Sequence, residues 1–390
     1  MTPSCTRLFS GGFRPFFLFG SLHAALMIAL WVPWFLGVFD LPSALDPVVW
    51  HQHELLFGYV PAMVAGFLLT AVPNWTGRPA LSGSPLVALF VLWVAGRLAI
   101  ALSAQIGLVP ATIVTLAFLP VLLVLTVREL AAAKNKRNYM IAAILSLLFI
   151  AQLLFFYEFV QLGRIEISGR LAITMILLLV GIIGGRIIPT FTGNWLRQNN
   201  PGRDVPSFGR FDIIAMLVSL VALILWILSA RLNGFSRFAG LFCLVAGALQ
   251  LARQLRWQPL RTVREPLVLI LHVAFFFLPL GFVLTGVGRF LDDAGLATAG
   301  LHAWTAGAIG ATTLAVMTRA TRGHSGQPLH APASTVSLIY VPIVLAALSR
   351  ITAAIMPAQA TLLLSIAAAA WVLAFLGFAV FYAPFILRRS

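Results

Sequence analysis

Long apolar segments follow one another along nearly the whole of this chain, and they constrain its fold more than any other feature. Of its 390 residues, 61% are hydrophobic and only 9% are charged. About 20 consecutive apolar residues cross the roughly 30 Å hydrocarbon core of a bilayer, and such a segment must satisfy its backbone hydrogen bonds internally, as a helix does. The sequence therefore predicts an all-α, polytopic membrane protein.

A window of about 19 residues divides the chain into about twelve such segments. We expect them at residues 16–38, 50–72, 84–104, 107–130, 138–162, 169–190, 210–231, 235–256, 266–288, 299–320, 333–355 and 360–387. They use nearly the whole sequence, so residues 1–390 are predicted to form a single transmembrane domain. The first segment lacks a small-residue cleavage site, and we expect it to be retained.

The basic residues behind the formal net charge of +15 are distributed unevenly. With a cytoplasmic N-terminus, the inside loops and ends carry most of them, from Arg7 and Arg14 to Arg388 and Arg389, whereas the outside loops carry few. This positive-inside pattern predicts a multi-pass protein with both termini cytoplasmic and an attraction to anionic lipid. The charge is thus a topology signal, and no nucleic-acid partner is expected.

Three segment exits resemble one another and indicate an internal repeat. The second, sixth and tenth segments end in "AVPNWTGRPALSG", "IIPTFTGNW" and "AVMTRATRGHSGQPL". The pattern fits three pseudo-symmetric four-helix units at about 1–130, 131–256 and 257–390, which resembles the catalytic subunits of haem–copper oxidases, whose haem ligands lie on helices 2, 6 and 10. The alternative is that Pro, Gly and Thr are ordinary helix-exit residues.

The segment "VVWHQHELLFGY" carries the sharpest chemical signal. His51 and His53 lie about 200° apart on a regular helix, so they can face two different sites but not readily share one metal. Glu54 is three residues from His51 and is expected to share its face, where a carboxylate could orient an imidazole or pass a proton. The alternative is a pair of interfacial histidines that are hydrogen-bonded to water.

Other histidines lie at matching predicted depths. His302 is level with His51 and His53 and precedes small residues that would leave room for a planar group such as haem or for a close helix neighbour. His23 and His272 form a second, more cytoplasmic pair, suited to copper or a second haem. A structural histidine is the alternative for each, and His324 is expected in a solvated loop.

Two intramembrane arginines need partners. Arg97 and Arg350 are predicted toward the outer side, level with His51 and His302. A buried guanidinium requires a counter-charge, which Glu54 or haem propionates could supply. Alternatively, both side chains extend to the interface. The two cysteines, Cys5 and Cys243, are far apart and no CxxCH motif occurs, so any haem is expected to be non-covalent, of the b type.

Over essentially its whole length the chain resembles the NnrS family, in "SGGFRPFFLFGSLHAAL", "WHQHELLFGYVPAMVAGFLLTAVPNWTGRPALSG" and "GLHAWTAGAIGATTLAVMTRATRGHSGQPL". The resemblance implies a bacterial inner-membrane protein that contains haem and copper and is linked to denitrification and nitric oxide tolerance. The family's motif histidines fall on His23, His51, His53, His272, His302 and His324.

The resemblance implies no settled reaction, so a nitric-oxide-related oxidoreductase stays one reading among several. Its electron donor would be a quinol or a cytochrome. The segments expected at 169–190 and 210–231 carry no histidine, which counts against a standard oxidase or nitric oxide reductase site. The alternatives are a membrane transporter, and a sensor or assembly factor that hands metal or haem to a denitrification complex.

Overall fold

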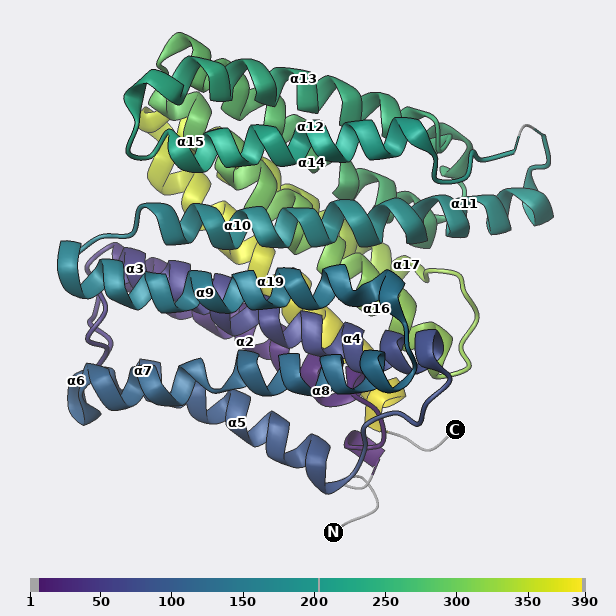
Figure 1. Cartoon of the computed structure of the whole chain (residues 1–390), viewed down its shortest axis with the longest axis horizontal. Helices are drawn as coiled ribbons and strands as arrows, with labels where there is room; N and C mark the ends of the chain where they lie inside the picture. The colour runs from purple at the N-terminus through teal and green to yellow at the C-terminus, as the bar shows by residue number, and fades with distance from the viewer. Residues whose placement is uncertain (1–6, 203, 388–390) are drawn as a thin grey trace. The chain divides into compact units, whose positions relative to one another are not determined.

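The computed structural model describes residues 7–202 and 204–387. Cys5, Arg388 and Arg389, which entered the sequence argument, lie outside the described residues, as does the basic residue Arg203. Helices account for nearly all of the ordered secondary structure, and the described part of the chain contains no strand (Figure 1). The predicted all-α class is therefore confirmed.

Eleven helices within the described residues are long and apolar enough to cross a membrane, which makes this a multi-pass membrane protein. They are Phe13–Phe35, Pro47–Thr76, Ser84–Ala101, Leu108–Ala132, Lys136–Leu162, Ile167–Asn199, Arg210–Leu228, Ser236–Leu255, Pro266–Leu291, Ala333–Ile355 and Pro357–Leu387. Most of their ends lie within a few residues of the predicted ones. The helix predicted at 169–190 continues to Asn199, because the polar sequence after Pro189 stays helical.

The segment predicted at 299–320 is helical but does not count among the eleven. It is formed by α15 (Ala294–His302), η6 (Ala303–Ala311) and α16 (Thr312–His324). Its many Gly, Ala and Thr residues make it less apolar than the other segments. The about twelve predicted segments therefore correspond to eleven candidate spanning helices and this helix rich in small residues.

The chain forms two compact units. Unit 1 comprises residues 1–175, 321–327 and 375–390, and unit 2 comprises residues 176–320 and 328–374. The three four-helix units suggested by the repeat stay a prediction.

In unit 1, α2 packs on α4, α5 packs on α7, and α8 packs on α9 (Figure 1). Its main elements are α2 (Phe13–Phe35), α3 (Pro47–His53), η1 (Glu54–Tyr59), α4 (Val60–Thr76), α5 (Ser84–Ala101), α6 (Ser103–Ile106), α7 (Leu108–Leu116), α8 (Phe118–Ala132), η2 (Lys136–Asn138), α9 (Tyr139–Leu162) and the start of α10 (Ile167–Leu179).

In unit 2, α13 packs between α12 and α14, and α14 also packs against α15 and η6. Besides α15, η6 and most of α16, its elements are η3 (Val180–Gly184), α11 (Gly185–Asn199), α12 (Arg210–Leu228), η4 (Asn233–Phe235), α13 (Ser236–Leu255), η5 (Pro259–Thr262), α14 (Pro266–Leu291), α17 (Ala333–Thr335), η7 (Val336–Tyr340), α18 (Val341–Ile355), η8 (Pro357–Gln359) and the first part of α19 (Ala360–Leu387).

Local sequence fixes the start of the helix that carries the HxHE motif. The side chain of Asp46 accepts hydrogen bonds from the backbone N–H groups of Val48 and Val49, both at 3.0 Å. Pro47 occupies the first helical position, where its missing N–H costs nothing. At the far end the chain leaves α4 through Gly77, at a φ of +69° that glycine adopts without strain. The motif therefore begins on the second turn of a well-capped helix.

Within the described residues, four segments of the long helices are π-helical, namely η1, η3, η6 and η7. The first three lie in the second, sixth and tenth predicted segments, the same three whose exits resemble one another. His53 immediately precedes η1, and His302 immediately precedes η6. Because π turns inside α-helices occur frequently at functional sites, these two histidines occupy equivalent and chemically interesting positions.

Candidate functional site

A buried carboxylate in unit 1 gathers three cationic or potentially cationic side chains. Glu54 Oε1 lies 2.9 Å from His53 Nδ1 and 2.6 Å from Arg97 Nη1, and Glu54 Oε2 lies 3.0 Å from His23 Nε2. The Glu54 side chain is 2% exposed. We call these four residues the Glu54 cluster. Three different helical elements, α2, α5 and the α3–η1 segment, thus meet at one carboxylate.

Arg97 completes the cluster and explains how a guanidinium is accommodated among apolar helices. Its Nη1 donates to Glu54 and its Nη2 donates to Thr115 Oγ1 on α7, both at 2.6 Å. Burying an isolated charge is expensive, and it becomes acceptable only when partners satisfy it. Glu54 is the protein counter-charge that the sequence required for Arg97, and the side chain is buried instead of reaching the interface.

Gly58 makes the close approach possible. A Cβ atom at this position would lie 2.5 Å from Arg97 Nη1 and 3.0 Å from both Glu54 Oε2 and His23 Nε2. Its carbonyl oxygen accepts a hydrogen bond from Trp93 Nε1 at 2.9 Å, so the backbone at this turn is also held in place. The π-helical turn and the missing side chain therefore create the space that the cluster occupies.

His53 has one ring nitrogen fixed and the other free for a ligand. Its Nδ1 is bonded to Glu54, whereas its Nε2 is buried and has no hydrogen-bond partner among the described residues. The rings of Phe57, Phe155 and Phe156 surround the imidazole, with centroids 5.2–5.8 Å away. A metal-ligating histidine typically donates its second ring N–H to a carboxylate in this way. His53 therefore has the chemistry of a ligand whose binding atom points into apolar surroundings.

His51 lies in a different environment, as its spacing from His53 predicted. Its ring stacks on Trp31, with a centroid separation of 3.9 Å and an interplanar angle of 22°. Trp31 is itself anchored by donating to the carbonyl of Pro47 at 2.8 Å. The expectation that Glu54 would serve His51 is wrong, because the carboxylate bonds the adjacent His53. The chain becomes π-helical at Glu54, so the regular three-residue spacing no longer sets which side chains meet.

The predicted depth of His23 is also wrong. The sequence placed it in a more cytoplasmic layer than His53, but the structure brings it to the same carboxylate. The helix of His23 begins at Phe13 and the partner helix begins at Pro47, each three residues earlier than expected. In two antiparallel helices both shifts move His23 and Glu54 toward the same level, and the long side chains span the rest.

Unit 2 contains a second buried histidine, His272, with one ring nitrogen hydrogen-bonded and the other without a partner in the described part of the chain. His272 Nε2 lies 2.9 Å from Thr192 Oγ1, and its Nδ1 is buried without a hydrogen-bond partner among the described residues. The neighbouring Gln254 donates to the backbone carbonyl of His272 at 2.6 Å, which fixes this turn of α14. His272 is thus held by α11 and α13 with one nitrogen available. The predicted pairing of His272 with His23 stays a prediction, since the two residues belong to different units.

His302 and Arg350 also belong to unit 2. The His302 side chain is half-buried at the last residue of α15, and its Nδ1 lies 3.5 Å from Thr305 Oγ1. Trp304, the second residue of η6, is fully buried and donates to the carbonyl of Leu278 at 3.2 Å. Arg350 is half-buried on α18. Convergence of His302 with His51 or His53, and a partner role for Arg350, stay predictions.

The two remaining histidines lie at helix ends and loops. His324 is the exposed last residue of α16, not a loop residue as expected, and its ring packs on Phe13 with a centroid separation of 5.5 Å. His330 Nδ1 lies 2.9 Å from Glu265 Oε2, the acid that caps α14. Neither contact resembles a closed metal site.

The available histidine nitrogens suit haem ligation better than they suit a copper site built from protein ligands alone. In the part of the chain that the structure describes, no three or more His, Cys, Asp or Glu side chains gather in a way that could hold a metal ion. Haem brings four nitrogen ligands of its own and needs only one or two axial side chains. A single buried imidazole nitrogen, oriented by a carboxylate and surrounded by aromatic rings, meets that smaller requirement.

Sequence reasoning missed several residues that shape these sites. Gly58 and Thr115 complete the Glu54 cluster, and Thr192 holds His272. The signal for Gly58 was present, because it lies one helical turn after the acid of the HxHE motif, where a side chain would crowd that acid. No comparable signal marks the two threonines, since a single hydroxyl in an apolar helix is common and its neighbours come from other helices.

The fold and this cluster define the class: a multi-pass helical membrane protein with a buried, ionisable, histidine-containing centre. Within that class, the chain belongs to the NnrS family, because the family model described as "NnrS protein" matches residues 7–390, nearly the whole length. None of the curated proteins matches this chain.

Proposed function

We propose that this protein binds haem through His53 and uses that centre to bind or detoxify nitric oxide. The observation that carries the proposal is the buried, unpartnered Nε2 of His53, whose other ring nitrogen is held by Glu54. A buried polar atom without a partner costs free energy, and a ligand that bonds it recovers that cost. Haem, once bound, would supply an iron centre that can bind nitric oxide.

The surroundings of His53 support a small apolar ligand. Phe155 and Phe156 are buried and contact the imidazole ring. Nitric oxide is uncharged and partitions into lipid, so an apolar lining admits it while excluding ions. The polar side of the ring carries Glu54 and Arg97, whose opposite charges offset each other. The charged residues that orient the imidazole are therefore different from the phenylalanines along which nitric oxide would reach it.

His302 and His272 of unit 2 are proposed as further cofactor ligands. His302 is supported by its position directly before a π-helical segment, which matches that of His53. His272 is supported by its buried and unpartnered Nδ1. Arg97 already donates a hydrogen bond to Glu54. Arg350 is therefore the better candidate for an ion pair with a haem propionate. Copper is proposed as a second cofactor on the family resemblance alone, and metal analysis tests it.

We further propose that the protein lies in the bacterial inner membrane with both termini cytoplasmic. The uneven distribution of Lys and Arg supports this orientation. A quinol or a soluble cytochrome would supply electrons if the nitric oxide chemistry is reductive. The reaction itself is left unassigned.

The test is an absorbance spectrum and metal analysis of the full chain purified in detergent, with and without nitric oxide. We expect a Soret band that shifts when nitric oxide is added. The variant His53→Ala should lose the band or change it to that of a different ligation state, whereas His330→Ala, whose exposed ring is bonded to Glu265, should keep it. A protein without haem, or one whose spectrum survives His53→Ala unchanged, would overturn the proposal.

The alternative function is transport or delivery of metal or haem. The buried ion pairs of the Glu54 cluster favour this alternative to a limited degree, because charged groups inside membrane helices also mark transport paths. Uptake of haem or copper into vesicles that contain the protein would support it. A haem that remains bound through purification, without flux, would support the proposed function instead.

A further inference from the structure

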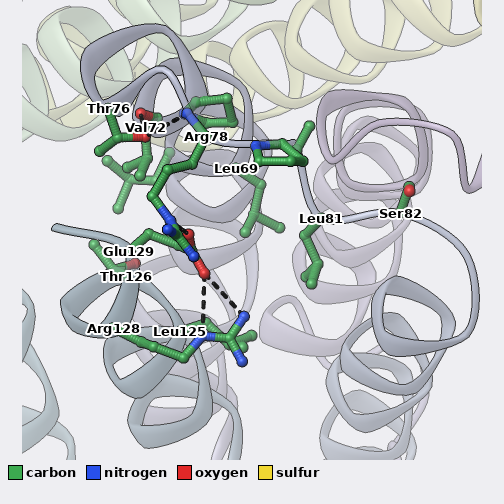
Figure 2. Close-up of a pocket in the computed structure, with 14 residues that line it drawn as sticks. Leu69, Val72, Thr76, Arg78, Leu81, Ser82, Leu125, Thr126, Arg128 and Glu129 are labelled. Carbon is green, nitrogen blue, oxygen red and sulfur yellow. Dashed lines mark hydrogen bonds and ion pairs between the residues drawn. The ribbon is translucent and has the colours of Figure 1, made fainter. Parts of the chain in front are cut away.

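A cavity in unit 1 lies where the ends of α4 and α8 meet the loop between α4 and α5. It has a volume of about 310 Å³. Apolar side chains form one part of its lining, and charged or hydroxyl side chains form another (Figure 2). The apolar part comprises Leu68, Leu69, Val72, Leu81 and Leu125. The loop is the "GRPALSG" part of the "AVPNWTGRPALSG" exit, to which neither the fold nor the Glu54 cluster assigns a task.

The charged part of the lining carries a surplus of positive charge. Figure 2 shows the guanidinium groups of Arg78 and Arg128 meeting at Glu129. Arg78 Nε donates to Glu129 Oε2 at 2.5 Å, and Arg128 Nη2 lies 2.9 Å from Glu129 Oε1. The two arginine side chains are 44% and 61% exposed. One carboxylate therefore positions two guanidinium groups that still present donors to the outside.

The same end of the unit carries further basic residues. Lys134, Lys136 and Arg137 follow α8 directly, and Asn135 ties their loop to the end of α4 by donating to the carbonyl of Trp75 at 2.9 Å. Residues 75–83 and 126–138 together hold five basic residues and one acidic residue. The charged lining of the cavity, Arg78, Arg128 and Glu129, is therefore net positive, and the nearby basic residues add to this charge, while the apolar wall is made of leucine and valine.

We propose that this cavity binds one anionic phospholipid of the phosphatidylglycerol type. The phosphodiester would lie against Arg78 and Arg128, and an acyl chain would follow the leucine-lined wall toward the bilayer. Basic pockets between helices at the cytoplasmic side of a membrane typically take such headgroups. A guanidinium suits a phosphate because it offers paired N–H donors in a fixed plane.

Because the cavity has both a positively charged part and an apolar wall, it suits two other ligand classes less well. A free phosphate ion would use the arginines but leave the apolar wall without a partner. A neutral quinol would use the wall and could donate to Glu129, but it would gain nothing from the positive charge around the rim. Only an amphipathic anion uses both parts of the cavity. This inference is independent of the proposed haem chemistry, and each can fail without the other.

The experiment uses the full chain purified in a neutral detergent. Binding of phosphatidylglycerol, phosphatidylcholine, glycerol phosphate and a short-chain quinol is measured by native mass spectrometry and by the shift in the thermal unfolding midpoint. We expect one phosphatidylglycerol to be retained and to raise the midpoint. Phosphatidylcholine, glycerol phosphate and the quinol should each have much smaller effects.

Two variants locate the site. Each Arg or Lys near a phosphate surface contributes about 1 kcal/mol, so the double variant Arg78→Gln/Arg128→Gln should weaken phosphatidylglycerol binding about 30-fold. The control is Arg164→Gln, because Arg164 also pairs with a carboxylate, that of Glu166, but lies in the loop between α9 and α10. This control should bind phosphatidylglycerol as the parent does.

A further variant tests the apolar wall if the double variant does not fold. Leu81→Trp fills the cavity and leaves both arginines in place, and we expect it to weaken phosphatidylglycerol binding as well. The inference is overturned if phosphatidylcholine or the quinol binds as tightly as phosphatidylglycerol. It is also overturned if the folded variants retain phosphatidylglycerol as the parent does.

Discussion

The carboxylate of Glu54 holds the imidazole of the residue directly before it, with 2.9 Å between Glu54 Oε1 and His53 Nδ1. Sequence neighbours rarely make such a contact inside a regular helix, because their side chains point about 100° apart. Here the helix changes from α to π between the two residues. The consequence is an imidazole whose orientation is fixed on one side and whose other nitrogen is available.

Glu54→Gln should weaken haem binding if His53 is the axial ligand. The amide can still contact His53, but it no longer provides a full negative charge to the ring, and loss of such an outer partner typically costs roughly 10- to 100-fold in metal affinity. The rate at which haem transfers to a scavenger protein measures the effect. Glu166→Gln, which alters an acid paired with exposed Arg164, serves as the control. Equal transfer rates for Glu54→Gln and the parent would contradict the orienting role.

Arg97→Gln should strongly destabilise the protein. It leaves the buried carboxylate of Glu54 without its guanidinium, and breaking a buried pair in this way costs about 3–5 kcal/mol. The thermal unfolding midpoint in detergent is the measurement. The double variant Glu54→Gln/Arg97→Gln removes both charges and should recover much of the loss. A double variant as unstable as Arg97→Gln alone would show that the arginine acts through packing and not through charge.

Gly58→Ala tests whether the missing side chain makes room for the Glu54 cluster. A Cβ atom would come within 2.5 Å of Arg97 Nη1, so the arginine would have to move. Overpacking of this kind typically costs about 1–3 kcal/mol. The control is Gly234→Ala, because a Cβ atom there meets nothing within 4 Å in the described part of the chain. If both variants unfold at the parent's midpoint, the cluster has more room than the structure indicates.

The sequence predicted the helices well because bilayer thickness sets their length. Most predicted ends lie within a few residues of the observed ones, and the main exception, the helix that reaches Asn199, runs into polar sequence that hydropathy does not register. The segment at Ala294–His324 was also placed correctly, although its small residues make it less apolar than the others.

The sequence identified the main residues of the candidate site, but it did not predict which of them contact one another. Glu54, His53 and Arg97 were all selected from the sequence, since each is costly to bury without a partner. Their pairing was partly wrong for two physical reasons. The π-helical turn changes which neighbours meet, and a shift of three residues at two antiparallel helix starts brings His23 to the level of Glu54. Neither effect follows from composition or regular periodicity.

The buried pair of Asp212 and Arg253 should be the main electrostatic contact that stabilises unit 2. Arg253 is fully buried, donates through Nε to Asp212 Oδ1 at 2.8 Å, and donates through Nη1 to the carbonyl of Gly181 at 3.1 Å. Gly185 allows this approach, because a Cβ atom there would overlap the guanidinium. Three elements, η3, α12 and α13, therefore depend on one charge pair.

Asp212→Asn should accordingly lower the stability of the protein by about 3–5 kcal/mol, because it leaves a buried guanidinium without a counter-charge. The matched control is Asp292→Asn, since Asp292 is exposed and asparagine readily adopts its left-handed backbone conformation, with a φ of +57°. Thermal unfolding in detergent compares the two variants. Because neither Asp212 nor Arg253 is a member of the Glu54 cluster, folded Asp212→Asn protein should still show the parent's haem spectrum at low temperature. Similar unfolding midpoints for the two variants would mean that the backbone and Gln250 contacts of Arg253 suffice without the carboxylate.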